Sequence, residues 1–292
     1  METLNKLLAV DLNYIVIAMI VVFYSLEQLL NSGFKYSKRP QHFLNNALFQ
    51  VVFIAVNIVW ASFTVYCIDW MNQRNIGLFY LIDVPVWVKL VAGVALLDFT
   101  SYWFHRTAHR VPFLWRFHRV HHSDTSMDSS TYFRSHPLEL FLWFGSSTII
   151  AAGIFGLDVM TLGLYFLVVT PFFVLEHTNL RFPKWIDKSF GLIFTTPNQH
   201  KVHHEQNQHY TDSNYADIFI LWDRLFGTYK HKEPELIQYG LKEFDEPKKQ
   251  QFWYLLRSPF INIDRVSSTT SADMPESEVV EAEVGRQVTP TQ

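Results

Sequence analysis

The chain has 292 residues, of which 49% are hydrophobic and only 17% are charged, and its formal net charge is −3. A typical soluble protein carries about 25% charged residues, so this composition excludes a disordered chain, a coiled coil and a general nucleic-acid binder. A single cysteine, Cys67, excludes an intramolecular disulfide and a cysteine-based zinc site.

Long apolar runs follow one another along the chain. A membrane helix needs about 20 mainly apolar residues, and buried helices of soluble proteins are usually shorter and amphipathic. The candidate runs are residues 12–30, 43–68, 84–104, 140–157 and 159–175. The last two are expected to form a helical hairpin that turns at residues 156–158. The sequence therefore predicts an all-α, polytopic membrane protein with three to five membrane helices.

Basic residues are distributed unequally among the segments between these runs. Several Lys and Arg lie in residues 31–42 and 105–138, whereas the loop 69–83 holds only Arg74. Because basic loops stay in the cytoplasm, we expect 31–42, 105–138 and 177–292 to be cytoplasmic. The first run lacks the features of a cleavable signal peptide and is expected to be an anchor.

The chain is divided by composition into four parts. Residues 1–89 are expected to form N-terminal membrane helices, 90–230 the histidine-bearing domain and 231–265 a C-terminal extension. Residues 266–292 contain no aromatic residue and many Ser, Thr and Glu. Such a segment cannot bury enough apolar surface to offset the entropy lost on ordering, so we expect a disordered tail.

The histidines are concentrated in one window and have the spacing of metal ligands. Of the 13 histidines, 11 fall between residues 105 and 209. One H-x-x-x-H motif and two H-x-x-H-H motifs supply eight of them: His105, His109, His118, His121, His122, His200, His203 and His204. Histidines at i, i+3 and i+4 lie close together on a helix. Eight imidazoles exceed the four ligands of one zinc ion, so the pattern indicates two metal ions, whose identity imidazole alone leaves open.

Two polar residues precede the first motif on the same predicted helix stripe. Asp98 and Tyr102 lie seven and three residues before His105, and groups in such positions often hydrogen-bond the outer nitrogen of a ligand imidazole. We expect Asp98 to face the metal site in this way. The alternative is that Asp98 pairs with a basic residue and only stabilises its span.

These motifs and their flanks resemble those of the fatty acid hydroxylase superfamily, which includes sterol desaturases, sterol methyl oxidases and alkylglycerol monooxygenase. The segment DFTSYWFHRTAH (98–109) is similar to the family pattern D-x-x-x-Y-x-x-H-R-x-x-H. HRVHHSD (118–124) and the stretch 212–229 resemble the later family segments, so the resemblance covers about residues 90 to 230. It implies a cytoplasmic helical cap with two non-haem iron ions. The implied reaction is hydroxylation or desaturation of a lipid by dioxygen, the lipid being of the sterol, fatty acyl or alkylglycerol class.

The resemblance also suggests further site residues. Family members often carry a histidine near the end of the hairpin, which favours His177 as a ninth ligand over a buried helix-end histidine. Arg181 stands where some members have a second histidine. Residues expected to support the ligands are, besides Asp98 and Tyr102, His136, His209, Asp212 and Asn214. His136 could equally have a structural role at the start of the next helix, and His42 and His231 are assigned no role.

Oxygen chemistry of this type consumes two external electrons. The sequence has neither a G-x-G-x-x-G motif nor a cysteine cluster, so we expect a separate electron donor, such as a ferredoxin or a small cytochrome with its reductase. Four basic residues near the histidine motifs could attract an acidic donor, or they could merely reflect the membrane topology. They are Arg106, Arg110, Arg116 and Arg119.

Two other functions compete with a lipid oxygenase. A metal-dependent membrane hydrolase would be expected to contain H-E-x-x-H, but Arg106 and Thr107 follow His105. A metal transporter would place ionisable residues in the middle of its spans, whereas these motifs lie at span ends and in loops. The sequence therefore favours the oxygenase.

Overall fold

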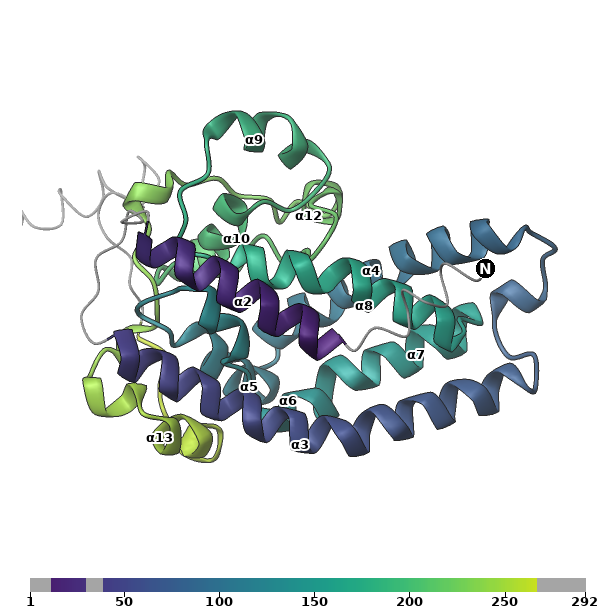
Figure 1. The fold of residues 1–292 in the computed structure, drawn as a ribbon, viewed down its shortest axis with the longest axis horizontal. Helices are drawn as coiled ribbons and strands as arrows, with labels where there is room; N and C mark the ends of the chain where they lie inside the picture. The colour runs from purple at the N-terminus through teal and green to yellow at the C-terminus, as the bar shows by residue number, and fades with distance from the viewer. Residues whose placement is uncertain (1–11, 30–38, 267–292) are drawn as a thin grey trace, which may run out of the picture.

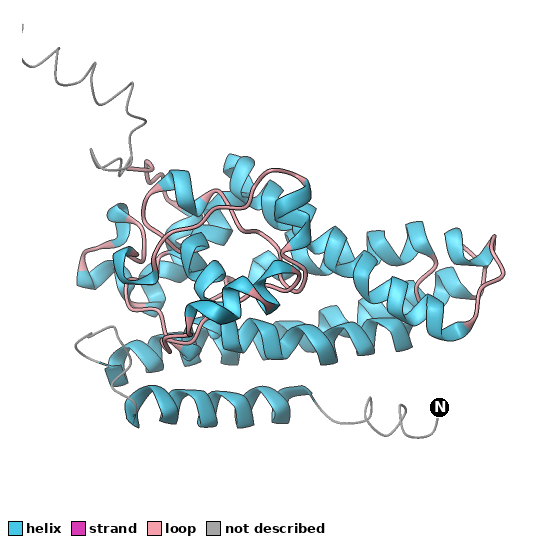
Figure 2. Cartoon of the chain, turned by 90° about the horizontal axis from the view of Figure 1, so that it is seen from above, coloured by secondary structure: helices cyan, strands magenta, loops and turns pink. Residues whose placement is uncertain are grey.

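The computed structural model describes residues 12–29 and 39–266, and these residues form helices joined by loops, without a strand (Figures 1 and 2). Five long helices run along the long axis of the molecule. They are α2 (Leu12–Leu29), α3 (Arg39–Asn72), α4 (Val86–Arg110), α7 (Gly145–Phe155) and α8 (Val159–Glu176). A short helix α6 (Pro137–Glu139) and one π-helical turn (Leu140–Phe144) lead into α7. The predicted all-α class is confirmed.

Among the described residues, four helices are long and apolar enough to cross a membrane. They are Pro40–Asn72, Val86–Arg110, Pro137–Phe155 and Val159–Glu176. This number lies within the predicted three to five and identifies an integral membrane protein. The first predicted span corresponds to α2, whose apolar stretch Tyr14–Leu29 is shorter.

The predicted hairpin turns where its sequence indicated. Helix α7 ends at Phe155 and α8 begins at Val159. Between them, Gly156 adopts a φ of +74°, which glycine tolerates without strain. Asp158 then caps α8, because its side chain accepts a hydrogen bond from the Thr161 backbone N–H at 2.7 Å.

Two loops close the end of the bundle that lies away from the histidines. A Cβ atom on Gly77 would lie 2.1 Å from the backbone nitrogen of Gly156, so this close approach of two turns requires glycine. The Asn72 amide donates to the Leu157 carbonyl oxygen at 3.0 Å. The α3–α4 loop is thereby fixed against the α7–α8 turn.

Short helices form a cap at the opposite end, where α4 and α8 finish (Figure 1). The α-helices of the cap are α5 (Pro112–His122), α9 (Lys184–Lys188), α10 (Pro197–His203), α11 (Gln208–Thr211), α12 (Leu221–Leu225) and α13 (Phe252–Arg257). Shorter 3-10 turns are η1 (Leu78–Tyr80) at the far end of the bundle and, in the cap, η2 (Ser129–Phe133), η4 (Phe190–Leu192), η5 (Pro234–Leu236), η6 (Lys242–Phe244), η7 (Pro247–Gln250) and η8 (Ser258–Phe260).

Helix α3 connects the membrane bundle to the cap. Its 34 residues span about 50 Å at 1.5 Å per residue, whereas the apolar bilayer core measures about 30 Å. Phe49, near the cap end of α3, packs on Phe252 of α13 with ring centroids 4.8 Å apart. The segment 231–265 thus contributes to the cap core through Leu241, Phe244, Phe252 and Leu255. Residues after 266 lie outside the described residues, as do 31–38 in the first basic segment.

Arg119 does not belong to an exposed basic surface. Its side chain is buried, with 3% of its surface exposed, and it donates to the carbonyl oxygens of Ser258 at 2.6 Å and Ile263 at 3.0 Å. The expectation that Arg119 could attract an electron donor is wrong, because backbone carbonyl oxygens inside the cap bind its guanidinium.

His42, which the sequence left without a role, ties α3 to the loop after the second histidine motif. Its Nε2 lies 2.8 Å from Asp124 Oδ1, and its Nδ1 lies 3.3 Å from Asp128 Oδ2. Burial alone would raise the pKa of Asp124, but His42 and Arg134 outweigh it and hold that pKa well below its ordinary value. The loop is therefore held against α3 by buried charge pairs.

Candidate metal centre

The structure brings nine histidines together in two adjacent groups. All nine are those that the sequence and the family resemblance selected, His177 included. Within each group, one ring nitrogen from every member lies within 4.8 Å of the others. The five-histidine group contains His105, His109, His118, His122 and His203, and the four-histidine group contains His121, His177, His200 and His204.

The two H-x-x-H-H motifs divide their histidines between the groups. The second motif lies on α5, where His118 and His122 at i and i+4 share one face and join the five-histidine group. In the third motif, on α10, His200 and His204 instead form the pair and join the four-histidine group. The remaining member of each motif reaches the other group. The rings of His122 and His204 stack with centroids 4.6 Å apart, so the two groups are neighbours.

The outer ring nitrogens of several histidines are held by backbone carbonyls. His105 Nδ1 lies 2.8 Å from the Tyr215 carbonyl oxygen, His203 Nδ1 lies 2.7 Å from that of Ser213, and His177 Nδ1 lies 2.5 Å from that of Phe173. A carbonyl oxygen can only accept a hydrogen bond, so in each ring Nδ1 carries the proton. The Nε2 lone pair of each ring therefore points into its group.

These lone pairs face one another at short range. His105 Nε2 lies 3.0 Å from His118 Nε2, and Nδ1 of His118 carries a proton because it donates to Glu139 at 2.6 Å. Two nitrogens without protons cannot share a hydrogen bond. The buried Nε2 atoms of His109 and His203 also have no hydrogen-bond partner. A cation at the centre of each group would satisfy these atoms, so the donor sets fit metal ions.

Burial keeps the imidazoles neutral. It lowers the pKa of His203 to about 3, with His118 adding to the effect, and it lowers the pKa of His177 to about 4. At neutral pH both rings are therefore uncharged and can bind a metal ion without first releasing a proton.

Carboxylates lie near the outer ring nitrogens of three histidines, on the side away from the centre of each histidine group. Asp212 Oδ1 lies 3.3 Å from His109 Nδ1, as expected for a group that supports a ligand. Sequence reasoning missed Glu139, which accepts the bond from His118, and Glu176, whose Oε2 lies 3.7 Å from His200 Nδ1. A carboxylate beside the outer nitrogen of an imidazole can complement a metal cation that the ring binds. A glutamate at the start or end of an apolar run was the signal that could have revealed both.

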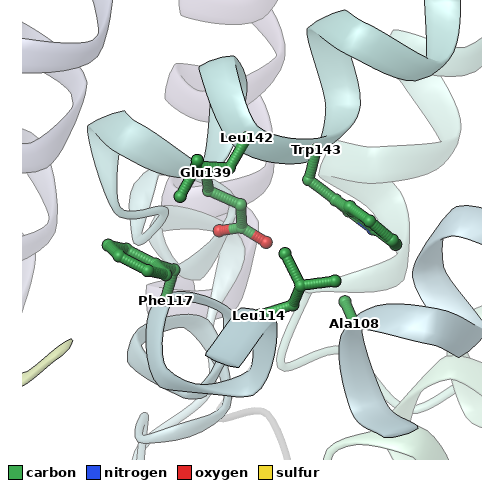
Figure 3. A pocket seen from close by; sticks show the side chains of 6 residues that line it. All are labelled: Ala108, Leu114, Phe117, Glu139, Leu142 and Trp143. Carbon is green, nitrogen blue, oxygen red and sulfur yellow. The ribbon is translucent and has the colours of Figure 1, made fainter. Parts of the chain in front are cut away.

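Figure 3 shows that the Glu139 carboxylate lies among apolar side chains, which include Phe117, Leu114 and Trp143. Of its two oxygens, only Oε1 has a hydrogen-bond partner, and this partner is His118. A buried carboxylate in such surroundings needs a compensating charge. A metal ion bound through His118 would supply it.

We expect Glu139→Gln to weaken metal binding without unfolding the protein. The amide keeps the size of the carboxylate but removes its charge and its strong acceptor for His118. Loss of such an outer partner typically costs about 10- to 100-fold in metal affinity. Metal retention during titration with a chelator measures the change, and Glu246→Gln on the exposed surface serves as the control. Equal retention by wild type and Glu139→Gln would contradict this role.

The expectations for Asp98 and Tyr102 are wrong. Asp98 accepts hydrogen bonds from the backbone N–H groups of Ile218 and Phe219 at 2.9 and 3.0 Å and from the Trp222 indole at 2.8 Å. The Tyr102 hydroxyl bonds Thr228 at 2.8 Å. Both residues thus bind the 217–228 segment and not a histidine ring, because that segment packs on this face of α4.

The remaining supporting candidates occupy other positions. His136 accepts from the Leu138 backbone N–H at 3.2 Å at the start of α6, and it also lines the cavity described below. Asn214 bonds the backbone of Gln199 and Lys230 rather than a histidine ring. His209 is exposed and packs on Tyr210, outside the buried groups. The last two expectations are therefore corrected, because backbone groups bind the Asn214 side chain and His209 lies on the surface.

A cavity of about 520 Å³ extends from the histidines between the membrane helices. Members of both groups line it, among them His105 and His177, together with apolar residues of α3, α4 and α8. The lining residues on α8 run from Val159 to Phe173, which corresponds to about 20 Å of helix. A long apolar molecule could therefore lie in the bundle with one part against the histidines.

The fold and site define a helical membrane protein with a buried dinuclear candidate metal centre. Residues 90–228 match the family model described as Fatty acid hydroxylase. Over these residues the chain matches the fatty acid hydroxylase superfamily, which confirms the resemblance of its motifs.

Several curated proteins are similar to the chain. Alkylglycerol monooxygenase of Homo sapiens is 35% identical over 200 residues, which are 66% of this chain and 41% of that protein. Very-long-chain aldehyde decarbonylase of Oryza sativa subsp. indica is 32% identical over 177 residues (59% and 65%). Ornithine lipid hydroxylase of Rhizobium tropici is 30% identical over 173 residues (51% and 44%). The chain thus spans less than half the length of the alkylglycerol monooxygenases that it matches. No solved structure matches it significantly.

Proposed function

We propose that the protein is a membrane-bound, non-haem di-iron oxygenase that hydroxylates or desaturates a lipid with dioxygen. The lipid belongs to the sterol, fatty acyl or alkylglycerol class. The observation that carries this proposal is the apolar cavity that leads from the membrane helices to both histidine groups. The names of the relatives, two of which describe lipid monooxygenation or hydroxylation, support it.

In this proposal the nine histidines would hold two iron ions, which would pass electrons from an external donor to dioxygen and so supply the oxidising power needed to break an unactivated C–H bond. The chain itself holds and orients the reactants. Glu139 and Asp212 fix the rings of His118 and His109 by hydrogen bonds to their outer nitrogens. The apolar wall of the cavity excludes water and aligns the lipid chain with the histidines.

The electrons come from a separate donor, such as a ferredoxin or a small cytochrome with its reductase. With Arg119 buried, the donor would meet the exposed Arg110 and the half-buried Arg116 at the cap. The basic residues of 105–138 further support a cytoplasmic cap, in a bacterial inner membrane or the endoplasmic reticulum.

Lipid mass spectrometry of cells with and without the gene tests the proposal. A lipid that gains 16 mass units identifies hydroxylation, and one that loses 2 identifies desaturation. Purified active protein should contain two irons per chain. If cells show neither lipid change, and the pure protein binds zinc in preference to iron, a hydrolase or a transporter becomes the better explanation.

Filling the cavity should slow turnover while leaving metal binding intact. Thr170 is buried on α8, lines the cavity and lies two turns before His177. We expect Thr170→Phe to reduce lipid turnover by at least about 10-fold, because the ring occupies space that the lipid needs. Val91→Phe, at a position of α4 that is 64% exposed, should leave turnover unchanged. Unaltered turnover by Thr170→Phe would place the substrate elsewhere.

A further inference from the structure

Several large apolar side chains lie exposed on one flank of the cap. Trp185 of α9 and Leu225 of α12 are 66% and 69% exposed. We call the whole set the flank patch, and its members are Trp185, Phe190, Leu192, Ile193, Leu221 and Leu225. A contiguous exposed apolar surface usually marks a binding site for protein or membrane.

The two segments that carry the flank patch are in contact. The Arg224 guanidinium of α12 donates to the Gly191 carbonyl oxygen of η4 at 3.1 Å. Phe194 packs on Phe190 with ring centroids 4.6 Å apart and on Phe219 with centroids 5.5 Å apart. The patch therefore forms one surface rather than scattered residues.

This surface lies beside the membrane helices and not beyond their ends. Phe190 stacks on Phe172 of α8, which is four residues, or about 6 Å, before the end of that helix. The Phe219 backbone N–H bonds Asp98, which is twelve residues, or about 18 Å, before the end of α4. Figure 1 shows α9 and α12 along the flank of the bundle at its cap end.

The length of α8 determines which part of the molecule the bilayer surrounds. Its 18 residues span about 27 Å, slightly less than the apolar core of a bilayer of about 30 Å. If α8 crosses the membrane, it must be immersed over its whole length. The bilayer then also surrounds the residues packed beside Phe172, which include Phe190 of the flank patch.

The residues at the border of the patch suit a membrane surface. Lys188 is exposed next to it, and such a long side chain can extend from an apolar surface to lipid phosphates. Trp185 belongs to the residue type that is enriched at membrane–water interfaces. Both features favour lipid over a soluble protein as the partner.

From these observations we propose that the flank patch is embedded in the bilayer leaflet on the cap side, with its side chains among the lipid acyl chains. The cap is then partly immersed in the membrane and does not lie wholly in water. This inference goes beyond the proposed function and does not depend on the metal or the reaction.

Fluorescence quenching by spin-labelled lipid tests this placement. Single cysteines are introduced at Leu192 and Leu225 in a Cys67→Ala background, labelled with a small fluorophore and reconstituted in phosphatidylcholine nanodiscs. Part of the phosphatidylcholine carries a nitroxide on acyl carbon 5. Ile58→Cys on α3, at a position 65% exposed, is the membrane control. Lys248→Cys, whose lysine side chain is 74% exposed on the cap, is the aqueous control.

We expect both flank positions to be quenched to a degree similar to Ile58 and several-fold more than Lys248. Quenching at the Lys248 level at both positions would overturn the proposal and identify the patch as a water-facing site for another protein. Because all four substituted side chains are exposed, the variants should fold; equal gel-filtration profiles check this.

Discussion

His203→Ala is expected to abolish catalysis and to remove at least one of two bound metal ions. His203 comes from the third motif but belongs to the five-histidine group, where its buried Nε2 has no other partner. Removing it leaves both a missing ligand and a cavity among the other imidazoles. The loss of activity should exceed the roughly 10- to 100-fold that follows from losing an outer hydrogen-bond partner. Elemental analysis of purified protein gives the metal count, and lipid turnover gives the activity.

His209→Ala provides a matched control in the same segment. His209 is exposed and lies outside both groups, so its removal should change neither the metal count nor turnover. A His203→Ala variant that keeps two metal ions would refute the assignment of His203. If instead both variants lost metal equally, the effect would reflect damage to the segment rather than loss of a ligand.

Asp98→Ala should destabilise the protein severely. Three donors, the N–H groups of Ile218, Phe219 and the Trp222 indole, lose an acceptor that is itself fully buried. An unsatisfied buried donor costs about 1–3 kcal/mol, so the total amounts to several kcal/mol. That is a large part of the 5–15 kcal/mol that stabilises a typical protein. The expected result is a strongly lowered melting temperature, or no folded protein, as measured by thermal unfolding in detergent.

Asp98→Asn separates this structural role from a role at the metal. The amide oxygen still accepts hydrogen bonds, so the variant should melt between wild type and Asp98→Ala. The fraction that folds should keep its full metal content, because Asp98 contacts none of the nine histidines in the described structure. A stable Asp98→Asn protein that lacked metal would restore the function first expected from the sequence. Val91→Ala, on the exposed face of α4, should behave as wild type.

Much of this architecture follows from local sequence patterns. Uninterrupted apolar runs predicted the membrane helices, since a bilayer requires about 20 apolar residues whatever the neighbours are. Gly156 and Asp158 marked the hairpin turn through backbone freedom and helix capping. The i, i+3, i+4 spacing placed the histidines on common helix faces, so the candidate ligands were recognisable before any contact was known.

Tertiary packing decided what local spacing could not. Asp98 shares a stripe with His105, yet its partners come from residues more than a hundred positions later, whose backbone donors had no other acceptor. Glu139 and Glu176 lie at the ends of apolar runs, where local spacing does not connect them to any histidine. Only the folded chain places them beside His118 and His200. Periodicity reports the direction of a side chain from its own helix but not what faces it there.

The sequence by itself thus determined the membrane helices and eight of the nine histidines, because these depend on composition or on spacing within one segment, whereas the class of protein and His177 came from the resemblance to a family. Only the tertiary structure assigned five histidines to one group and four to the other, and only it showed the cavity that reaches both. It also showed which carboxylates orient the rings. These features arise from contacts between α3, α4, α5, α8 and α10, whose relative positions depend on how all their surfaces pack together.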